Sequence, residues 1–124
     1  MNWLLGDRKC DLKVGIKDDL AIPLMEMLDV PKGSFVFDPY ADSRIPAHRV
    51  VRLAENIRSA ITELMERHRR NIMVRLRLPR WPLWAENVLR EETAKDPLLG
   101  VLEKLRMLCT KAIELNCDIV VLGD

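Results

Sequence analysis

Apolar residues follow a helical period near the end of the chain. They recur every three or four positions and make one wide stripe, formed by Leu98, Val101, Leu102, Leu105, Leu108, Cys109, Ala112 and Ile113. Asp96 is a favourable N-cap, Pro97 is a favourable first helical residue, and Asn116 suits a left-handed C-terminal cap. The pattern predicts an amphipathic helix over residues 97–115.

A continuous apolar run, Ile119-Val120-Val121-Leu122, follows this helix. A run without alternation is typical of a strand that is covered on both faces. We therefore expect residues 119–122 to form an internal strand, which ties this end of the sequence into the core.

Three further segments have the pattern of strands. Residues 12–16 alternate between apolar and polar or small side chains, and residues 35–37 form a short Phe-Val-Phe run. Residues 71–78 alternate clearly, with Arg75 and Arg77 on the polar side. Because alternate side chains of a strand point to opposite faces, this pattern predicts one buried and one wet face.

Two shorter helices are expected. The first has Asp18 or Asp19 as its N-cap and carries Leu20, Leu24 and Leu28, and it must start close to Pro23, which is tolerated only in a first turn. The second is expected over residues 83–94, and it follows the break at residues 79–82, where two prolines interrupt the preceding strand pattern.

A long helix is expected over residues 45–70, with Pro46 in its first turn. Its apolar stripe runs from Val50 to Met65, and its other face is charged. Glu63 with Arg67 and Glu66 with Arg70 are spaced four apart in the favourable order, each pair contributing ~0.3 kcal/mol.

The order of these elements predicts a mixed α/β (α+β) fold. We expect residues 1–124 to form a single small domain with about four strands and helices packed on the sheet. Strands separated by helices favour parallel pairs through right-handed crossovers. The wet face at Arg75 and Arg77 instead favours an edge strand there, and the strand order stays open.

The charge balance bears on the class of partner. The chain has 20 basic and 19 acidic residues among 124, which gives a net charge of +1. A general nucleic-acid binder is usually clearly basic, so the balance argues against that class while permitting a local basic patch.

No apolar run is long enough to span a bilayer, and the first residues lack the pattern of a signal peptide. The three cysteines, Cys10, Cys109 and Cys117, form no CxxC pair, which argues against a zinc site or a redox motif. We expect Cys109 to be a small buried hydrophobic residue, and we expect the protein to be cytoplasmic.

Asp38, Asp42 and His48 lie in and after the loop that follows residues 35–37. Ligands of α/β proteins bind beyond the carboxyl ends of strands, and two carboxylates with an imidazole can hold a divalent metal. The corresponding hypothesis is a metal-dependent hydrolase. Turn and cap chemistry explains the same residues more simply, with Asp42 or Ser43 capping the next helix, so we expect no metal here.

Arg75, Arg77, Arg80, Trp81 and Trp84 are the predicted partner-binding residues. Alternate arginines of a strand share a face, and both tryptophans follow closely. Arginine and tryptophan are enriched in binding hot spots, and they also suit stacking on single-stranded nucleic acid. In the alternative interpretation, the tryptophans fold onto the core and the arginines pair with glutamates of the following helix.

Residues 67–70 (Arg-His-Arg-Arg) are another basic group, which we interpret as a solvated helix end that complements the helix dipole. No Gly-x-Ser-x-Gly motif or glycine-rich phosphate loop occurs. We therefore predict no catalytic residue and no bound cofactor.

These observations favour a non-enzymatic cytoplasmic protein that binds a protein partner. Within that class we expect a small bacterial antagonist, of the immunity type, which neutralises a toxin or an enzyme by direct binding. One alternative is a regulatory module that contacts nucleic acid through the Arg/Trp patch. The other is the hydrolase that would use Asp38, Asp42 and His48.

Overall fold

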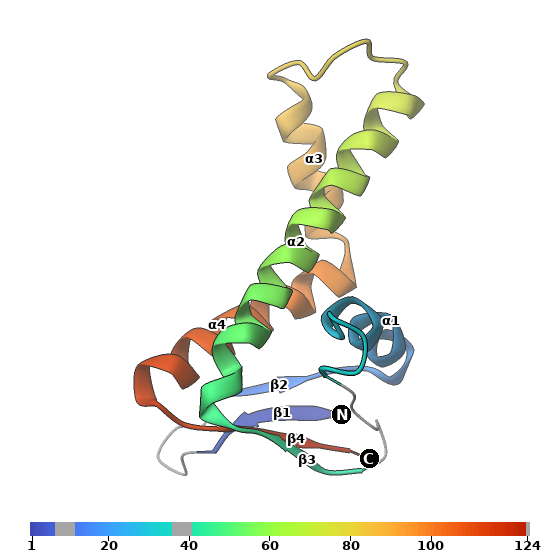
Figure 1. Cartoon of the computed structure of the whole chain (residues 1–124). Helices are drawn as coiled ribbons and strands as arrows, with labels where there is room; N and C mark the ends of the chain where they lie inside the picture. The colour runs from blue at the N-terminus through green and yellow to red at the C-terminus, as the bar shows by residue number, and fades with distance from the viewer. Residues whose placement is uncertain (7–11, 36–40, 124) are drawn as a thin grey trace.

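The computed structural model describes residues 1–6, 12–35 and 41–123. This part of the chain forms a small mixed α/β domain, with four antiparallel strands in one sheet and four helices (Figure 1). The elements in chain order are β1 (Asn2–Leu5), β2 (Lys13–Gly15), α1 (Asp18–Leu28), β3 (Ser43–Ile45), α2 (Ala47–Arg75), α3 (Ala85–Ala94), α4 (Pro97–Leu115) and β4 (Ile119–Leu122). The predicted fold class is confirmed.

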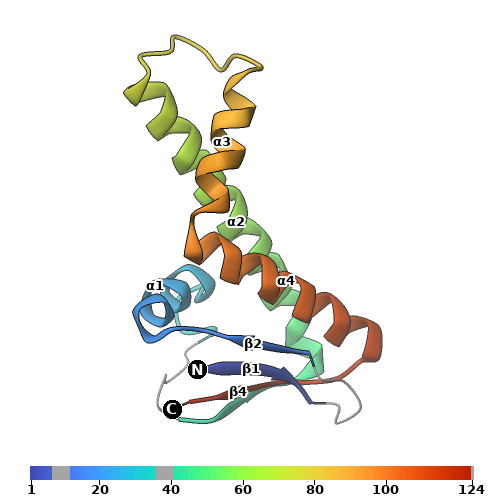
Figure 2. The same cartoon turned by 180° about the vertical axis from the view of Figure 1, so that it is seen from behind.

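The sheet has the strand order β2-β1-β4-β3, and all neighbouring strands are antiparallel. Trp3 of β1 stands opposite Val14 of β2 and Val121 of β4, and all three side chains are buried. A second buried row across β1, β4 and β3 consists of Leu5, Ile119 and Ile45. These rows form the inner face of the sheet, on which α1, α2 and α4 all lie (Figures 1 and 2).

The core lies between this face and the helices. Its largest contribution comes from α2 and α4, which pack against each other on the same side of the sheet, before α2 runs on away from it (Figure 2). Their fully buried side chains include Leu53, Ile57, Leu102, Leu105 and Leu108. No helix in the described part of the chain is both long enough and apolar enough to cross a membrane.

The expected parallel pairing is wrong. Only residues 6–12 connect β1 to β2, which is too short for the crossover that a parallel pair requires. Both β1 and β3 were missed because strands of three or four residues carry little periodic signal. For the strand expected at residues 35–37, Phe35 is buried outside any strand, and residues 36 and 37 lie outside the described residues.

The strand expected at residues 71–78 is also wrong, because α2 continues to Arg75. Ile72 is fully buried, and it lies eight residues after the buried Leu64, as one face of a helix requires. Extending an existing helix adds one hydrogen bond for each residue that it orders. This gain of backbone hydrogen bonds outweighs the preference of the short alternating segment for a strand.

The C-terminal strand β4 is internal, as expected, because it pairs with β1 on one side and β3 on the other. The expectation that both its faces are covered is wrong. Ile119 and Val121 are fully buried, whereas Val120 and Leu122 are only half-buried on the face that carries no helix (Figure 1).

The predicted ends of α4 are confirmed. The Asp96 carboxylate accepts hydrogen bonds from the backbone N–H groups of Leu98 at 3.0 Å and Leu99 at 3.3 Å. Pro97 is the first helical residue, and Asn116 adopts the left-handed conformation, with φ at 49°. Each of these positions follows from the preference of one residue type, so the sequence alone could locate them.

The other helix starts differ from expectation. Lys17 is the N-cap of α1, which places Asp18 and Asp19 in the first turn, where carboxylates still complement the helix dipole. Pro46 is the N-cap of α2 rather than a residue of its first turn.

Cys109 is fully buried on α4, as expected for a small hydrophobic residue. Desolvation raises the pKa of its thiol to about 12. The thiol therefore stays neutral and unreactive at physiological pH.

Candidate functional site: the tip of a helical hairpin

A helical hairpin projects from the layer of helices, away from the sheet (Figures 1 and 2). It consists of the last turns of α2, the connecting residues 76–84 and α3, which packs back against α2. Ile72 on α2 and Ala85 and Leu89 on α3 are buried, and they are not part of the main core cluster. The hairpin therefore buries apolar side chains of its own, in addition to those of the main core.

The end of α2 has a Schellman geometry. The Leu78 N–H donates to the Met73 carbonyl at 2.9 Å, and the Arg77 N–H donates to the Val74 carbonyl at 3.3 Å. Arg77 adopts the left-handed conformation that this motif requires, with φ at 54°. The chain then turns through Pro79 and Pro82, neither of which could continue the helix.

Positive charge is concentrated at the end of the hairpin, which we call the tip (residues 70–84). Its four charged residues, Arg70, Arg75, Arg77 and Arg80, are all arginines. The remaining 16 basic and 19 acidic residues give the rest of the chain a net charge of −3. The near-neutral net charge of the chain is therefore the sum of a basic tip and a remainder with a net negative charge.

Most of these charges are not neutralised. Arg75 pairs with Glu92 of α3. Within the described residues, no ion pair forms at Arg70, Arg77 or Arg80. Three guanidinium groups at the tip therefore keep their capacity to bind an anionic group.

The tip also exposes large apolar side chains. Leu83 is 91% exposed, Val74 is 79% exposed and Trp84 is 54% exposed. Trp81 is half-buried, and its indole Nε1 donates to Glu86 at 2.8 Å. Clustered exposure of this kind typically marks a contact surface.

All five predicted partner-binding residues lie at this tip. They come together on a helical hairpin and not, as expected, on one strand face. The alternative interpretation is partly met, because Arg75 pairs with Glu92 and Trp81 bonds Glu86, but Trp84 does not fold onto the core. Arg70, Val74 and Leu83 were not recognised, although the helical period through residue 75 places Arg70 and Val74 on one face.

An open hollow of about 490 Å³ lies along the tip. It is lined by Arg70, Met73, Val74, Arg77 and Leu78. Apolar side chains contribute most of the lining surface, and the two guanidinium groups supply its charge. The hollow is suited to a ligand in which an apolar side chain lies next to an anionic group.

The basic residues 67–70 are not a helix end, because α2 continues past them. Arg67 pairs with Glu63 at 2.6 Å, as expected, whereas Glu66 pairs with Arg69 and not with Arg70. His68 Nε2 lies 2.7 Å from the Asp96 carboxylate, which links α2 to the N-cap of α4 at the base of the hairpin.

The expected metal-binding residues do not form a site in the described chain. Asp42 accepts a hydrogen bond from the Gly123 N–H at 3.1 Å, His48 is exposed in the first turn of α2, and Asp38 lies outside the described residues. No group of three or more histidine, cysteine, aspartate or glutamate residues with metal-binding geometry occurs among the residues described.

Asp118 performs the capping role that was assigned to Asp42 or Ser43. One carboxylate oxygen accepts from the Ala47 N–H at 2.8 Å, and the other accepts from Arg44 at 3.0 Å. The hydrogen bond from Arg44 and that from the Ala47 backbone lower the pKa of Asp118 below its usual value. The side chain thereby joins the start of α2 to the residue that precedes β4.

We expect Asp118→Asn to lower the melting temperature at neutral pH. We also expect the melting temperature of this variant to fall less steeply than that of the wild type as the pH is lowered. Because the folded pKa is depressed, the contribution of Asp118 is complete above the unfolded pKa of about 4 and is lost as pH falls through the folded pKa. Thermal unfolding between pH 7 and pH 2 measures this. Glu91→Gln, at an exposed carboxylate of α3 that forms no ion pair with a described residue, should follow the wild-type curve. Parallel curves for Asp118→Asn and wild type would contradict the expectation.

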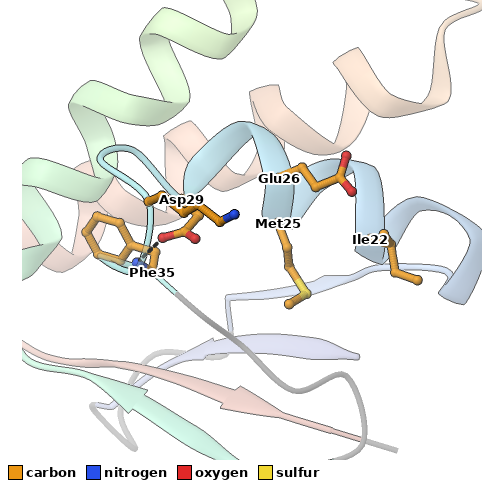
Figure 3. A pocket seen from close by; sticks show the side chains of 6 residues that line it. Ile22, Met25, Glu26, Asp29 and Phe35 are labelled. Carbon is orange, nitrogen blue, oxygen red and sulfur yellow. Dashed lines mark hydrogen bonds between the residues drawn. The ribbon is translucent and has the colours of Figure 1, made fainter.

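A second hollow, of about 340 Å³, lies beside α1 (Figure 3). Met25 points toward the sheet from it and Glu26 points away. The carboxylate of Asp29 accepts hydrogen bonds from the Gly33 N–H at 3.0 Å and the Phe35 N–H at 2.8 Å, which lower its pKa. Residues 36–40, which follow Phe35 in the chain, lie outside the described residues.

Comparison of the chain with protein-family models, curated proteins and solved structures finds no match.

Proposed function

We propose that this chain is a non-enzymatic binding protein that docks through its tip on an acidic, partly apolar surface of a protein partner. The observation that carries the proposal is the coincidence of guanidinium groups without ion pairs and exposed apolar side chains at one projecting end. Arginine and tryptophan are over-represented among residues that dominate binding energy, and acidic partner surfaces complement the tip in charge.

The exposed aliphatic side chains favour a protein over a nucleic acid. Val74 and Leu83 gain little from phosphates or from base edges, but they gain from burial in an apolar depression. Nucleic-acid binding remains the second candidate, because the exposed Trp84 ring belongs to the same arginine-rich tip and could stack on a base.

Within this class we place the chain among small antagonists of the bacterial immunity type, which neutralise a toxin or an enzyme by covering its active site. Active sites are concave, and a narrow projecting hairpin can enter such a site. The burial of Ile72, Ala85 and Leu89 within the hairpin supports this proposal, since a preorganised element loses less entropy on binding.

The test is capture of the partner from native lysate, followed by calorimetry with the purified partner. We expect Arg80→Glu and Trp84→Ala each to weaken the complex by ~30-fold, the size of a hot-spot loss of about 2 kcal/mol. Arg80 is exposed, so Arg80→Glu should change stability by less than about 0.5 kcal/mol. Trp84 is only 54% exposed, so binding by Trp84→Ala is compared at a temperature well below the melting transition of that variant.

Arg58→Glu is the matched control, because Arg58 is exposed on α2 outside the tip and has no ion pair with a described residue. It should bind as the wild type does. Equal binding by all four proteins would refute the tip as the docking surface. Capture of RNA or DNA that moderate salt releases would support the second candidate.

A further inference from the structure

Arg77 occupies a backbone position that glycine fits better than any other residue. Its φ of 54° is left-handed, and the position after the helix C-cap in a Schellman motif is usually glycine. In this conformation the Cβ of any other residue crowds the backbone and destabilises the fold, whereas glycine has no Cβ. The side chain at this position therefore weakens the fold locally, and such positions concentrate where function requires a particular side chain.

The left-handed turn places the Arg77 side chain on the same hollow as Arg70, which lies two turns earlier on α2. Neither guanidinium group forms an ion pair with a described residue. Met73, Val74 and Leu78 line the hollow with them. Two arginines at one apolar hollow combine bidentate carboxylate recognition with burial of an alkyl group.

We infer that this hollow recognises a carboxylate carried next to an apolar side chain, on an acidic segment of a partner protein. The inference rests on the proposed function and names the chemistry that the partner must present. Arg70 and Arg77 bind the Asp or Glu carboxylate, while the neighbouring apolar side chain packs against Met73 and Val74.

Two other occupants fit less well. The hollow is lined by aliphatic and thioether groups and by no aromatic ring, so a nucleic-acid base has no stacking surface in it. A second copy that docks tip to tip would bring two basic tips together without an acidic residue in either.

The test uses the full chain and a defined probe. The probe is an acetylated and amidated amphipathic peptide with Glu and Leu on one face, and its matched control has Gln in place of each Glu. The measurement is the change in the amide chemical shifts of the protein as peptide is added. The residues whose shifts change locate the binding site, and the dependence on peptide concentration gives the affinity. We expect shifts centred on residues 70–78, with the Gln peptide binding at least ~10-fold more weakly.

Arg77→Gly separates binding from folding. It should weaken binding of the Glu peptide by ~10-fold while raising the melting temperature by about 3 °C, because glycine relieves the backbone strain. A purely structural role for Arg77 would lower the melting temperature or leave binding unchanged, and either result would overturn the inference.

The remaining outcomes distinguish this inference from the proposed function. Shifts centred on Leu83 and Trp84 that survive Arg77→Gly would overturn the inference and leave the tip as a docking surface. Three other results would also overturn the inference. They are equal affinity for the Glu and Gln peptides, absence of shift changes at residues 70–78, and tighter binding of single-stranded DNA to the same hollow. The proposed function fails separately, if Arg80→Glu and Trp84→Ala both bind the captured partner as strongly as the wild type does.

Discussion

A chain that lacks residues 118–124 should not fold cooperatively. The deletion removes β4, which lies between β1 and β3 and therefore holds both. Ile119 and Val121 are fully buried, and each contributes roughly 1.5–3 kcal/mol. Trp3 would lose its cross-strand partner Val121, and α2 would lose its cap at Asp118. Together these losses are comparable with a typical net stability of about 5–15 kcal/mol.

Circular dichroism and chemical denaturation of the truncated chain measure this effect. Deletion of residues 123–124 alone is the matched control, because it removes the Gly123 N–H bond to Asp42 but no residue of β4. The control should keep a cooperative transition. A soluble 1–117 chain with the wild-type melting temperature would show that β4 is dispensable.

Ile72→Ala should loosen the hairpin while leaving the main core folded. Ile72 is fully buried where α2 meets α3, and truncation of such a residue typically costs about 2–5 kcal/mol. It is not part of the main core cluster, so the loss should be confined to the hairpin. The tip would then lose its defined geometry, and partner binding should fall with it.

Hydrogen exchange resolved by residue is the appropriate measurement. Amides of residues 70–75 and 85–94 should lose protection, whereas amides of α4 and β4 should keep theirs. Val51→Ala serves as the control, since Val51 is an aliphatic residue of the same helix but is half exposed. Uniform loss of protection through the whole domain would mean that the hairpin and the core unfold as one unit.

The basic tip and the stability of the hairpin are linked in these experiments. A variant that loses binding through Arg80→Glu keeps the hairpin protected, while Ile72→Ala loses both. Comparing the two variants therefore separates the chemistry of the proposed contact surface from the rigidity of the hairpin.

Features set by local chemistry were predictable. The N-cap at Asp96, the first-turn Pro97 and the left-handed Asn116 each reflect a preference that operates within a few residues. The internal position of β4 followed from its continuous apolar run, and the burial of Cys109 followed from the stripe of α4. The mixed α/β class follows from these elements.

Features that depend on distant contacts were not predictable. Residues 71–75 alternate like a strand, but a long helix that already continues to Arg70 gains a hydrogen bond with each further residue. The pairing of β1 with β4 joins the two ends of the described chain, and no local pattern encodes it. The capping of α2 by Asp118 likewise spans 71 positions.

The sequence by itself determined which residue types the proposed contact surface offers, because Arg75, Arg77, Arg80, Trp81 and Trp84 are neighbours along the chain. Only the tertiary structure decided how they are presented. The packing of α3 on α2 buries Ile72 and Leu89, neutralises Arg75 through Glu92, and leaves the guanidinium groups of Arg70 and Arg77 beside an apolar hollow. Hydrophobic periodicity specifies each helix, but the angle, length and pairing of two helices depend on side chains far apart in sequence.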